Sequence, residues 1–462
     1  MQSYLLLGDV GGTKAQLELR RWDPEMLTID DDDPPLAFTR TRTVDHPSVQ
    51  AIVEAFLAEA TPALAATNGR VRLGVLAVCG PVDATGRADL IGPHFGASGW
   101  VVEAGSLGAA LGFEVAIIND FEAVGTSLPV VPRAERAVLH APNMTSSCGS
   151  LSASSAGATA AGTEGDVFAC LGPGTGLGEC FGVWQSTDGG GSAGGSGSGC
   201  AGEQLARRGH YKICCSEGGM SDFAARTADE WACKRWLAAR AEAPPPMATP
   251  PLPPPWALSG GDGFVEVERV VSGAGIANCY RWAVAAFGPV EGVDEAVAAE
   301  VAASPEPAGV IARHGSPTTV AHKGGDGGAG AVVEVPPRCG LCRRAVDMFL
   351  FALGGEAANL ALRYQATGGV FIAGGGVGPK LLFGLRRATE LGHCAAAGGG
   401  GGDAASCQSL VVAGYLTKVR SWPAYAATCP LVAVATSGDA LALQGVAEVA
   451  ARHMRARGAA AR

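Results

Sequence analysis

Two adjacent polar residues, Asn119 and Asp120, follow an apolar run with the composition of a β-strand, Val115 to Ile118. The carboxyl ends of strands are where α/β sheets hold their ligands, so this pattern predicts a carboxylate at a ligand-binding edge. A carboxylate in that position can accept the proton of a hydroxyl group during phosphoryl transfer. Because an Asn-Asp pair is also common at turns and helix caps, the pair alone leaves both interpretations open.

A glycine-rich turn near the amino terminus is a second candidate for chemistry. The turn follows one strand-like run and precedes another, and its notable residues are Asp9, Gly11, Gly12 and Thr13. Backbone N–H groups and a Thr hydroxyl at such a turn can surround phosphate oxygens, and an Asp at the strand end can hold Mg²⁺ through water. The spacing is not that of a Walker loop. A bare two-glycine hairpin with no ligand remains the alternative.

Two further glycine clusters also follow strand-like runs. One contains Gly174, Thr175 and Gly176, and the other contains Gly374 and Gly375. The first fails the spacing of a dinucleotide-binding fingerprint, since Leu177 stands where a third glycine would belong. Two Gly-Thr-Gly-like turns are much less expected by chance than one. We therefore interpret both as phosphate-binding turns, and the third cluster as a candidate site for adenosine or its phosphates.

The spacing of apolar residues predicts the helices and strands that must position these residues. A stripe of apolar residues at helical spacing predicts an amphipathic helix packed on a sheet: Val49, Ile52, Val53, Phe56 and Leu57. Strands are expected at 73–78, 115–118, 167–171 and 370–373, and helices at 341–363 and from residue 440 onward. Between them, stretches dominated by Gly, Ser, Ala or Pro predict flexible surface loops at 145–163, 188–199, 244–255 and 397–402.

Composition excludes several classes of partner. The chain has 462 residues, 47 % of them apolar, which is enough for two domains with separate cores. Its formal net charge of −10, with no basic block, gives no footprint for nucleic acid. The apolar runs are interrupted well short of the ~20 residues of a membrane span, so we expect no membrane association. The first strand-like run begins at Leu5, which leaves no room for a signal peptide and predicts a cytoplasmic protein.

Fourteen cysteines are scattered along the chain, several of them in apolar runs, which favours a reducing compartment over a disulfide framework. Cys339 and Cys342 have the spacing of zinc ligands, but no second pair lies at the usual distance and the segment starts a helix. The segment 190–194 matches G-x-S-x-G inside a Gly/Ser tract with no strand before it, which argues against a nucleophile elbow. We therefore predict no metal site built from protein ligands.

At this point a family resemblance becomes specific. Seven segments, in the same order along the chain, resemble those of the bacterial-type glucokinase family: Gly8–Lys14, Leu76–Asp83, Ile118–Pro129, Gly172–Glu179, Ser216–Phe223, Glu268–Tyr280 and Phe371–Val377. The resemblance extends to the carboxy-terminal stretch and leaves out only the low-complexity segments. The zinc motif of the related repressor and open-reading-frame kinase family is missing.

The resemblance implies an α/β fold of two ribonuclease-H-like domains with the active site in the cleft between them, as in hexokinases, heat-shock ATPases and actin. We expect residues 1–125 to form a smaller domain, with a carboxy-terminal helix at about 440–462 packing back on it, and residues 126–439 to form a larger one. The resemblance also implies ATP with Mg²⁺, glucose as the acceptor, and a homodimer.

The same resemblance assigns roles to individual residues. Asp120 would be the general base on the sugar 6-hydroxyl, while Asn119, Glu217 and Glu268 would bind the other hydroxyls. The turns that contain Thr13 and Thr175 would hold the ATP phosphates. These roles agree with the reading from the residues, because ring hydroxyls are best fixed by carboxylate and amide groups.

Two departures from the family pattern concern the sugar site. Met220 stands where the family has a His, and a thioether offers no strong hydrogen bond to a hydroxyl. The family's Leu-Thr-Asn-x-x-Trp segment corresponds to Leu90–Trp100, which is longer and lacks the Asn. The leading hypothesis is a glucokinase, and the alternative that these departures support is a hexose-sensing regulator with a kinase fold.

Overall fold

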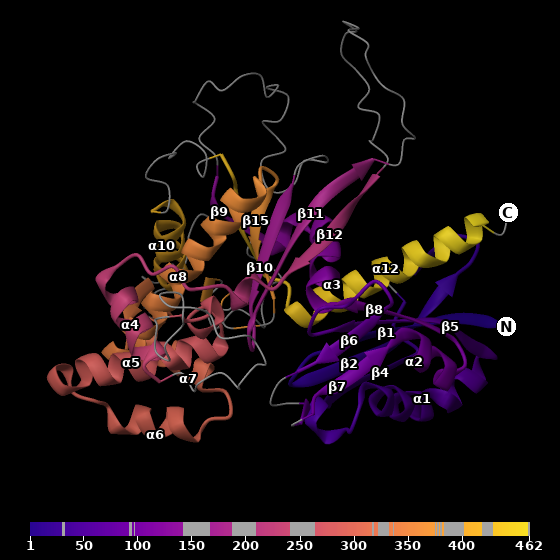
Figure 1. Cartoon of the computed structure of the whole chain (residues 1–462), viewed down its shortest axis with the longest axis horizontal. Helices are drawn as coiled ribbons and strands as arrows, with labels where there is room; N and C mark the ends of the chain where they lie inside the picture. Colours follow the sequence, from indigo (N-terminus) through magenta and orange to yellow (C-terminus); the bar gives the residue numbers. More distant parts are fainter. Residues whose placement is uncertain are drawn as a thin grey trace, which may run out of the picture.

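Two β-sheets with helices on both faces make up the computed structural model of the chain (Figure 1). The structure describes residues 1–29, 33–91, 95–96, 98–141, 167–186, 209–240, 264–316, 318–321, 332–335, 337–374, 376, 378, 381–382, 402–417 and 428–460. The predicted loops at 145–163, 188–199 and 244–255, and the 190–194 motif, lie outside the described residues. So does 397–401, whereas Gly402, which we placed in that loop, begins helix α10.

The first sheet has the strand order β3-β2-β1-β5-β8, with β4 also paired to β2. Strands β1 and β2 are antiparallel, whereas β1, β5 and β8 run parallel. The predicted strands at 73–78 and 115–118 are confirmed as parts of β5 and β8. The bounds are β1 Gln2–Val10, β2 Lys14–Asp23, β3 Thr28–Ile29, β4 Ala37–Arg42, β5 Gly69–Val78 and β8 Glu114–Asn119.

The second sheet repeats this plan in the order β12-β11-β10-β15-β16-β9. Three antiparallel strands come first, and β15 and β16 then continue parallel to β10. Each sheet is therefore an antiparallel hairpin set extended by parallel strands, which is the predicted ribonuclease-H-like arrangement. The bounds are β9 Arg136–His140, β10 Phe168–Pro173, β11 Leu177–Ser186, β12 Gly209–Ser216, β15 Gly369–Ile372 and β16 Leu431–Val434. The shorter pairs are β6 Arg87–Leu90 with β7 Trp100–Glu103, and β13 Thr318–Ala321 with β14 Val332–Val335.

Helices fill three layers around the two sheets. The outer face of the first sheet carries α1 (Val49–Ala66) and α2 (Ala104–Leu111), and α3 (Asp120–Ser127) and α12 (Gly438–Ala460) lie between the sheets (Figure 1). The outer side of the second sheet carries the remaining helices: α4 Ala228–Ala238, α5 Gly273–Glu291, α6 Glu295–Ala303, α7 Pro307–Gly315, α8 Gly340–Tyr364 and α10 Gly402–Leu416.

The strand period of two assigns side chains to these layers. In β1, Leu5 and Leu7 belong to the core between the sheets, whereas Leu6 packs into the core under α1. Both faces of the sheet are thus buried, which explains the unbroken apolar run. The predicted stripe of α1 is confirmed, with Leu57 only partly buried, and the Ser48 hydroxyl caps the helix by accepting from the N–H of Ala51.

The carboxy-terminal helix α12 packs on α3, β1 and β5. It runs from the centre of the molecule along the first sheet (Figure 1). The placement of the domain boundary at residue 125 stays a prediction.

Two helices are more apolar than the sequence analysis expected, although α8 agrees with the predicted 341–363 to within one residue at each end. Among the described residues, Val49–Ala66 and Gly340–Tyr364 could cross a membrane by length and composition alone. Our statement that no apolar run approaches that length was therefore wrong for these segments. Most of the apolar window in α8 is buried in the second core, as in the core helix of a globular domain, and α1 buries one face on the first sheet. Neither helix by itself is more than weak evidence for membrane association.

Candidate active site

The carboxyl ends of β1, β5 and β8 meet at one edge of the first sheet, because these three strands are parallel. Asn119 ends β8 and is the N-cap of α3, where its Oδ1 accepts from the N–H groups of Phe121 at 2.8 Å and Glu122 at 3.3 Å. Its Nδ2 donates to the Gly80 carbonyl at 2.8 Å. The interpretation of the Asn-Asp pair as a helix cap is confirmed, and the role of Asp120 as proton acceptor stays a prediction.

Asp120 combines limited exposure with a crowded electrostatic setting. Burial raises its pKa from 3.8 to about 6; the N–H of Phe121, which donates to Oδ1 at 2.9 Å, opposes this shift, and the charge of Glu217 adds to it. The charge of Glu217 therefore contributes to the electrostatic environment of Asp120. The result is a carboxylate that titrates close to neutral pH, as general bases commonly do.

Asp9 lies two strands away at the same edge. Burial, followed by the charges of Asp120 and Asp439, raises its pKa to about 7, while Lys14 opposes the shift. Cys79, just beyond the end of β5, responds to the same charges: its burial and Asp120 raise the pKa of the thiol to about 12. The edge of the sheet therefore concentrates negative charge.

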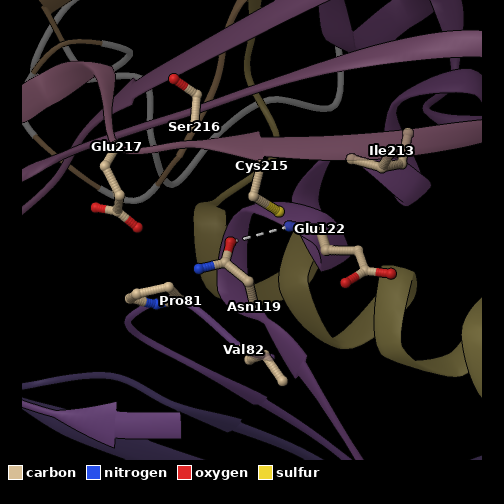
Figure 2. Close-up of a pocket in the computed structure, with 8 residues that line it drawn as sticks. All are labelled: Pro81, Val82, Asn119, Glu122, Ile213, Cys215, Ser216 and Glu217. Atoms are coloured by element: carbon tan, nitrogen blue, oxygen red, sulfur yellow. Dashed lines mark hydrogen bonds between the residues drawn. The ribbon is translucent and has the colours of Figure 1, made fainter. Parts of the chain in front are cut away.

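A cavity of about 310 Å³ opens where this edge meets the second sheet (Figure 2). One wall comes from the end of the first sheet and the segments that follow its strands, with Pro81 and Val82 after β5, Asn119 at the end of β8 and Glu122 in α3. The other wall comes from β12 and its following loop, with Ile213, Cys215, Ser216 and Glu217. Figure 2 shows the Glu217 carboxylate pointing into the space above Asn119. Two of the predicted sugar-binding residues, Asn119 and Glu217, thus line one cavity, and Asp120 follows Asn119 directly.

The two predicted phosphate turns meet tip to tip. Thr13 and Thr175, which are 162 positions apart, have their hydroxyl oxygens 3.4 Å from each other. The first turn is the β1–β2 hairpin, closed by the Gly11 N–H donating to the Lys14 carbonyl at 3.0 Å. The second is the β10–β11 hairpin, and the first helical residue of α5, Gly273, donates its N–H to the Gly174 carbonyl at 2.9 Å. Glycine-lined backbone from both sheets therefore surrounds one place.

The third glycine cluster lies alongside the second turn. Gly374 has φ +105°, and a Cβ there would lie 3.4 Å from the Cα of Gly172. A Cβ on Gly376 would overlap the Pro173 carbonyl oxygen, so only glycine allows this approach. Gly375 lies outside the described residues, and its predicted role stays a prediction.

Glu268 occupies a different place from the one that its predicted role suggests. Its Oε2 accepts from the Leu177 N–H at 3.1 Å, and a Cβ on Gly176 would lie 2.5 Å from the same oxygen. Burial raises the pKa of Glu268. Glu268 therefore supports the second glycine turn, and it is not among the residues that line the cavity. Its bond to a sugar hydroxyl stays a prediction.

The two departures from the family pattern lie beside the cavity but do not line it. Met220 ends the short 3-10 turn Gly218–Met220 after Glu217, and its side chain is 51 % exposed. Trp100 begins β7, opposite Leu90, and its ring meets that of Phe95 edge-on at 5.1 Å.

Several residues of the site carry no signal that our sequence reading used. Glu122, Cys215 and Ser216 line the cavity, although each lies inside or next to a segment that carried the family resemblance. Lys14 pairs with Asp439 of α12 at 2.5 Å, and Arg40 reaches the same oxygen at 3.1 Å. These pairs join residues about 400 positions apart, so no local pattern could reveal them.

The Cys339–Cys342 pair begins a helix, as expected. The Cys339 Sγ accepts from the Cys342 N–H at 3.3 Å and caps α8. In the part of the chain that the structure describes, no group of three or more His, Cys, Asp or Glu side chains could hold a metal ion.

Comparison with known proteins identifies the family of this chain. The sequence model of the glucokinase family matches residues 6–197 and 257–390, together more than half of the chain. A glucokinase from Synechocystis sp. is 27 % identical over 386 residues, covering 82 % of this chain and 84 % of its own.

Solved structures support the fold. The glucokinase of an Antarctic psychrotroph matches with a TM-score of 0.54 at 22 % identity over 96 % of this chain and 98 % of its own. The glucokinase of Balamuthia mandrillaris, solved in complex with glucose, matches with a TM-score of 0.59 at 16 % identity over 97 % of this chain and 94 % of its own. The extent of the family match is decisive, and this chain belongs to the glucokinase family.

Proposed function

We propose that this protein transfers the γ-phosphoryl group of ATP to the 6-hydroxyl of glucose, giving glucose 6-phosphate and ADP. The observation that carries the proposal is the convergence of two groups of residues on one cleft. Asn119 and Glu217 line the cavity, Asp120 follows Asn119 at the start of α3, and the turns of Thr13 and Thr175 meet at one place. A sugar site and a phosphate site are what phosphoryl transfer to a hydroxyl requires.

The cavity suits a monosaccharide in size and polarity. Its volume of about 310 Å³ is at the low end of the roughly 300–1,000 Å³ of ligand pockets. The Glu217 carboxylate can accept hydrogen bonds from ring hydroxyls, and the second N–H of the Asn119 amide, beside the one that donates to Gly80, can donate to a hydroxyl oxygen. Pro81 and Val82 supply an apolar wall. These groups would orient the sugar so that its 6-hydroxyl faces Asp120.

The glycine turns would hold the nucleotide phosphates through backbone N–H groups and the hydroxyls of Thr13 and Thr175. The donor set also fits Mg²⁺. Asp9 has a pKa raised to about 7 by burial and by neighbouring carboxylates, and a divalent cation nearby would relieve that repulsion. Since no protein cluster in the described residues could hold the ion by itself, Asp9 would bind it together with water and phosphate oxygens. When bound, Mg²⁺ neutralises phosphate charge.

Asp120 would take the proton during transfer. As the sugar O6 forms its bond to the γ-phosphorus, the O6 proton passes to a carboxylate oxygen of Asp120, and the bond from phosphorus to the bridging oxygen breaks to leave ADP. A base with a pKa of about 6 is roughly 90 % ionised at pH 7. Its pKa is also close enough to pH 7 for it to hold the transferred proton. The Asn119 cap keeps the Asp120 backbone at the start of α3.

The test is turnover by the purified chain with ATP and a panel of hexoses, followed as ADP release. We expect glucose to be phosphorylated, Asp120→Asn to lose turnover while keeping sugar binding by calorimetry, and Glu59→Gln, on the exposed face of α1, to behave as wild type. Sugar binding without turnover in the wild type would instead support the hexose-sensing regulator, for which Met220 and the altered Trp100 segment are the motivation.

A further inference from the structure

Glu179 is a carboxylate in the middle of an apolar layer. It lies on β11 and is 1 % exposed. Its cross-strand partners are Leu171 on β10 and Ser216 on β12. Leu177 and Phe181, two positions away on either side, share its face of the strand and belong to the core under α8 or pack against it. An ionisable side chain thus occupies a position on β11 where the alternation of the strand predicts an apolar side chain.

The carboxyl group of Glu179 has little to stabilise a charge. Neither of its oxygens has a hydrogen-bond partner among the described residues. Burial, then the charge of Glu356 of α8 and to a smaller extent that of Glu217, raise its pKa to about 8, and Arg363 of α8 opposes the rise. Arg363 is already engaged by Glu356 at 3.3 Å, and Asn359 donates to the other oxygen of Glu356 at 2.6 Å. Burial without a hydrogen-bond donor therefore favours the neutral form of Glu179.

The same carboxyl group touches the backbone that carries Glu217. A Cβ on Gly218 would overlap the Glu179 Oε2, so the acid packs directly against the Gly218 backbone. The Ser216 hydroxyl holds that backbone from one side by accepting the Gly218 N–H at 3.0 Å. Glu217 lies between these two residues and points into the cavity (Figure 2).

We propose that Glu179 is a positioning residue for the sugar site: as a neutral acid it supports the Glu217–Gly218 backbone, and its ionisation displaces that backbone and weakens sugar binding. The proposal rests on the proposed function for the identity of the ligand. A charged Glu179 would be repelled by the negative charges of Glu356 and Glu217. Since no donor among the described residues can solvate it there, it must move toward water or push its neighbours away.

The test compares wild type with Glu179→Gln, which keeps the shape and removes the titration. The dissociation constant for glucose is measured by calorimetry from pH 6 to pH 9. In wild type we expect it to be constant below about pH 7 and to rise about tenfold per pH unit above pH 8, because the neutral fraction falls at that rate. In Glu179→Gln it should stay flat. An identical pH dependence in both proteins would overturn the proposal.

A second measurement needs no ligand, so it separates this proposal from the proposed function. Amide hydrogen exchange of the segment 217–220 is compared between the two proteins at pH 6.5 and pH 9. We expect equal rates at pH 6.5 and faster exchange in wild type at pH 9; equal rates at both values would refute the positioning role even if glucose proved not to be the substrate. Should Glu179→Gln not fold, Gly218→Ala should weaken glucose binding, and adding Glu179→Ala should restore it. If the double variant bound glucose as weakly as Gly218→Ala alone, the contact between the Glu179 carboxyl group and the Gly218 backbone would be contradicted.

Discussion

The proposed role of Asp120 predicts how kcat/KM for glucose depends on pH in the acidic range, because Asp120 must be ionised to accept a proton. Its pKa is raised from 3.8 to about 6, so kcat/KM should rise with pH through about 6 and level off near pH 7, before the weaker sugar binding expected from the ionisation of Glu179 lowers it above about pH 8. At pH 5 a base with this pKa is about one-tenth ionised, whereas an ordinary Asp would be more than roughly nine-tenths ionised. We therefore expect kcat/KM for glucose at pH 5 to be about a tenth of its plateau.

The variant Glu217→Gln tests what raises the pKa of Asp120. It removes one of the charges that raise the pKa of Asp120, so the half-maximal pH should move down. Glu217 also lines the cavity, and KM will therefore change as well. The quantity compared is the pH at which kcat/KM is half-maximal, and not the plateau value of kcat/KM. Glu59→Gln, an exposed carboxylate of α1, serves as the control and should leave the midpoint unchanged.

The assay is ADP release, quantified by chromatography at saturating MgATP, which avoids coupling enzymes that lose activity in acid. Wild type and variant are compared in the same buffers, so protonation of ATP affects both equally. Two results would refute the reasoning. A wild-type midpoint near pH 4 would mean that Asp120 is not the base or is not buried in the working enzyme. An unmoved midpoint in Glu217→Gln would mean that the charge of Glu217 does not act on Asp120.

Three further outcomes are expected. Asp120→Ala should lower kcat by ~10²–10⁴-fold while calorimetry still detects glucose binding; activity within a few-fold of wild type would contradict its role. Met220→His should change KM for glucose by less than about twofold, since a solvated surface hydrogen bond contributes little and Met220 is 51 % exposed. Glu179→Gln should match wild type in free energy of unfolding at pH 4.5 and exceed it by about 3 kcal/mol at pH 7, as measured by urea titration. The reason is that the pKa of Glu179 rises from 4.5 to about 8 on folding. Wild type therefore loses ~1.4 kcal/mol of stability per pH unit between these two values.

Local patterns predicted the elements that carry the site. The stripe of α1 and the apolar runs of β5, β8, β10 and β15 repeat at the periods of helix and strand, and these periods depend only on neighbours along the chain. The position of Asp120 at a strand end followed from the same reasoning. The two-sheet fold came from the family resemblance and not from periodicity, because parallel pairing such as that of β10 with β15 joins residues about 200 positions apart.

Contacts between distant segments account for what the sequence did not reveal. The approach of Thr13 to Thr175, the pair of Lys14 with Asp439 and the placement of Glu268 on the second turn each depend on how the two sheets face each other. Glu179 is a different case, since its signal was local: a charged residue interrupts the apolar alternation of Leu177 and Phe181. A broken pattern of this kind is typical of functional positions, and our sequence reading passed over it.

The carboxylates of the cleft also act on the cysteines around it. Cys215 is exposed and lines the cavity, a position where a thiol would ordinarily be open to oxidation. Burial of its sulfur, with the charges of Glu122 and Asp120, raises its pKa to about 12, and Cys79 behind Asp120 is held at about 12 in the same way. Because the thiolate is the reactive form, both cysteines are chemically quiet at neutral pH. Burial and the neighbouring carboxylates, which raise the pKa of Asp120, the proposed base, therefore also lower the reactivity expected of the two thiols beside it.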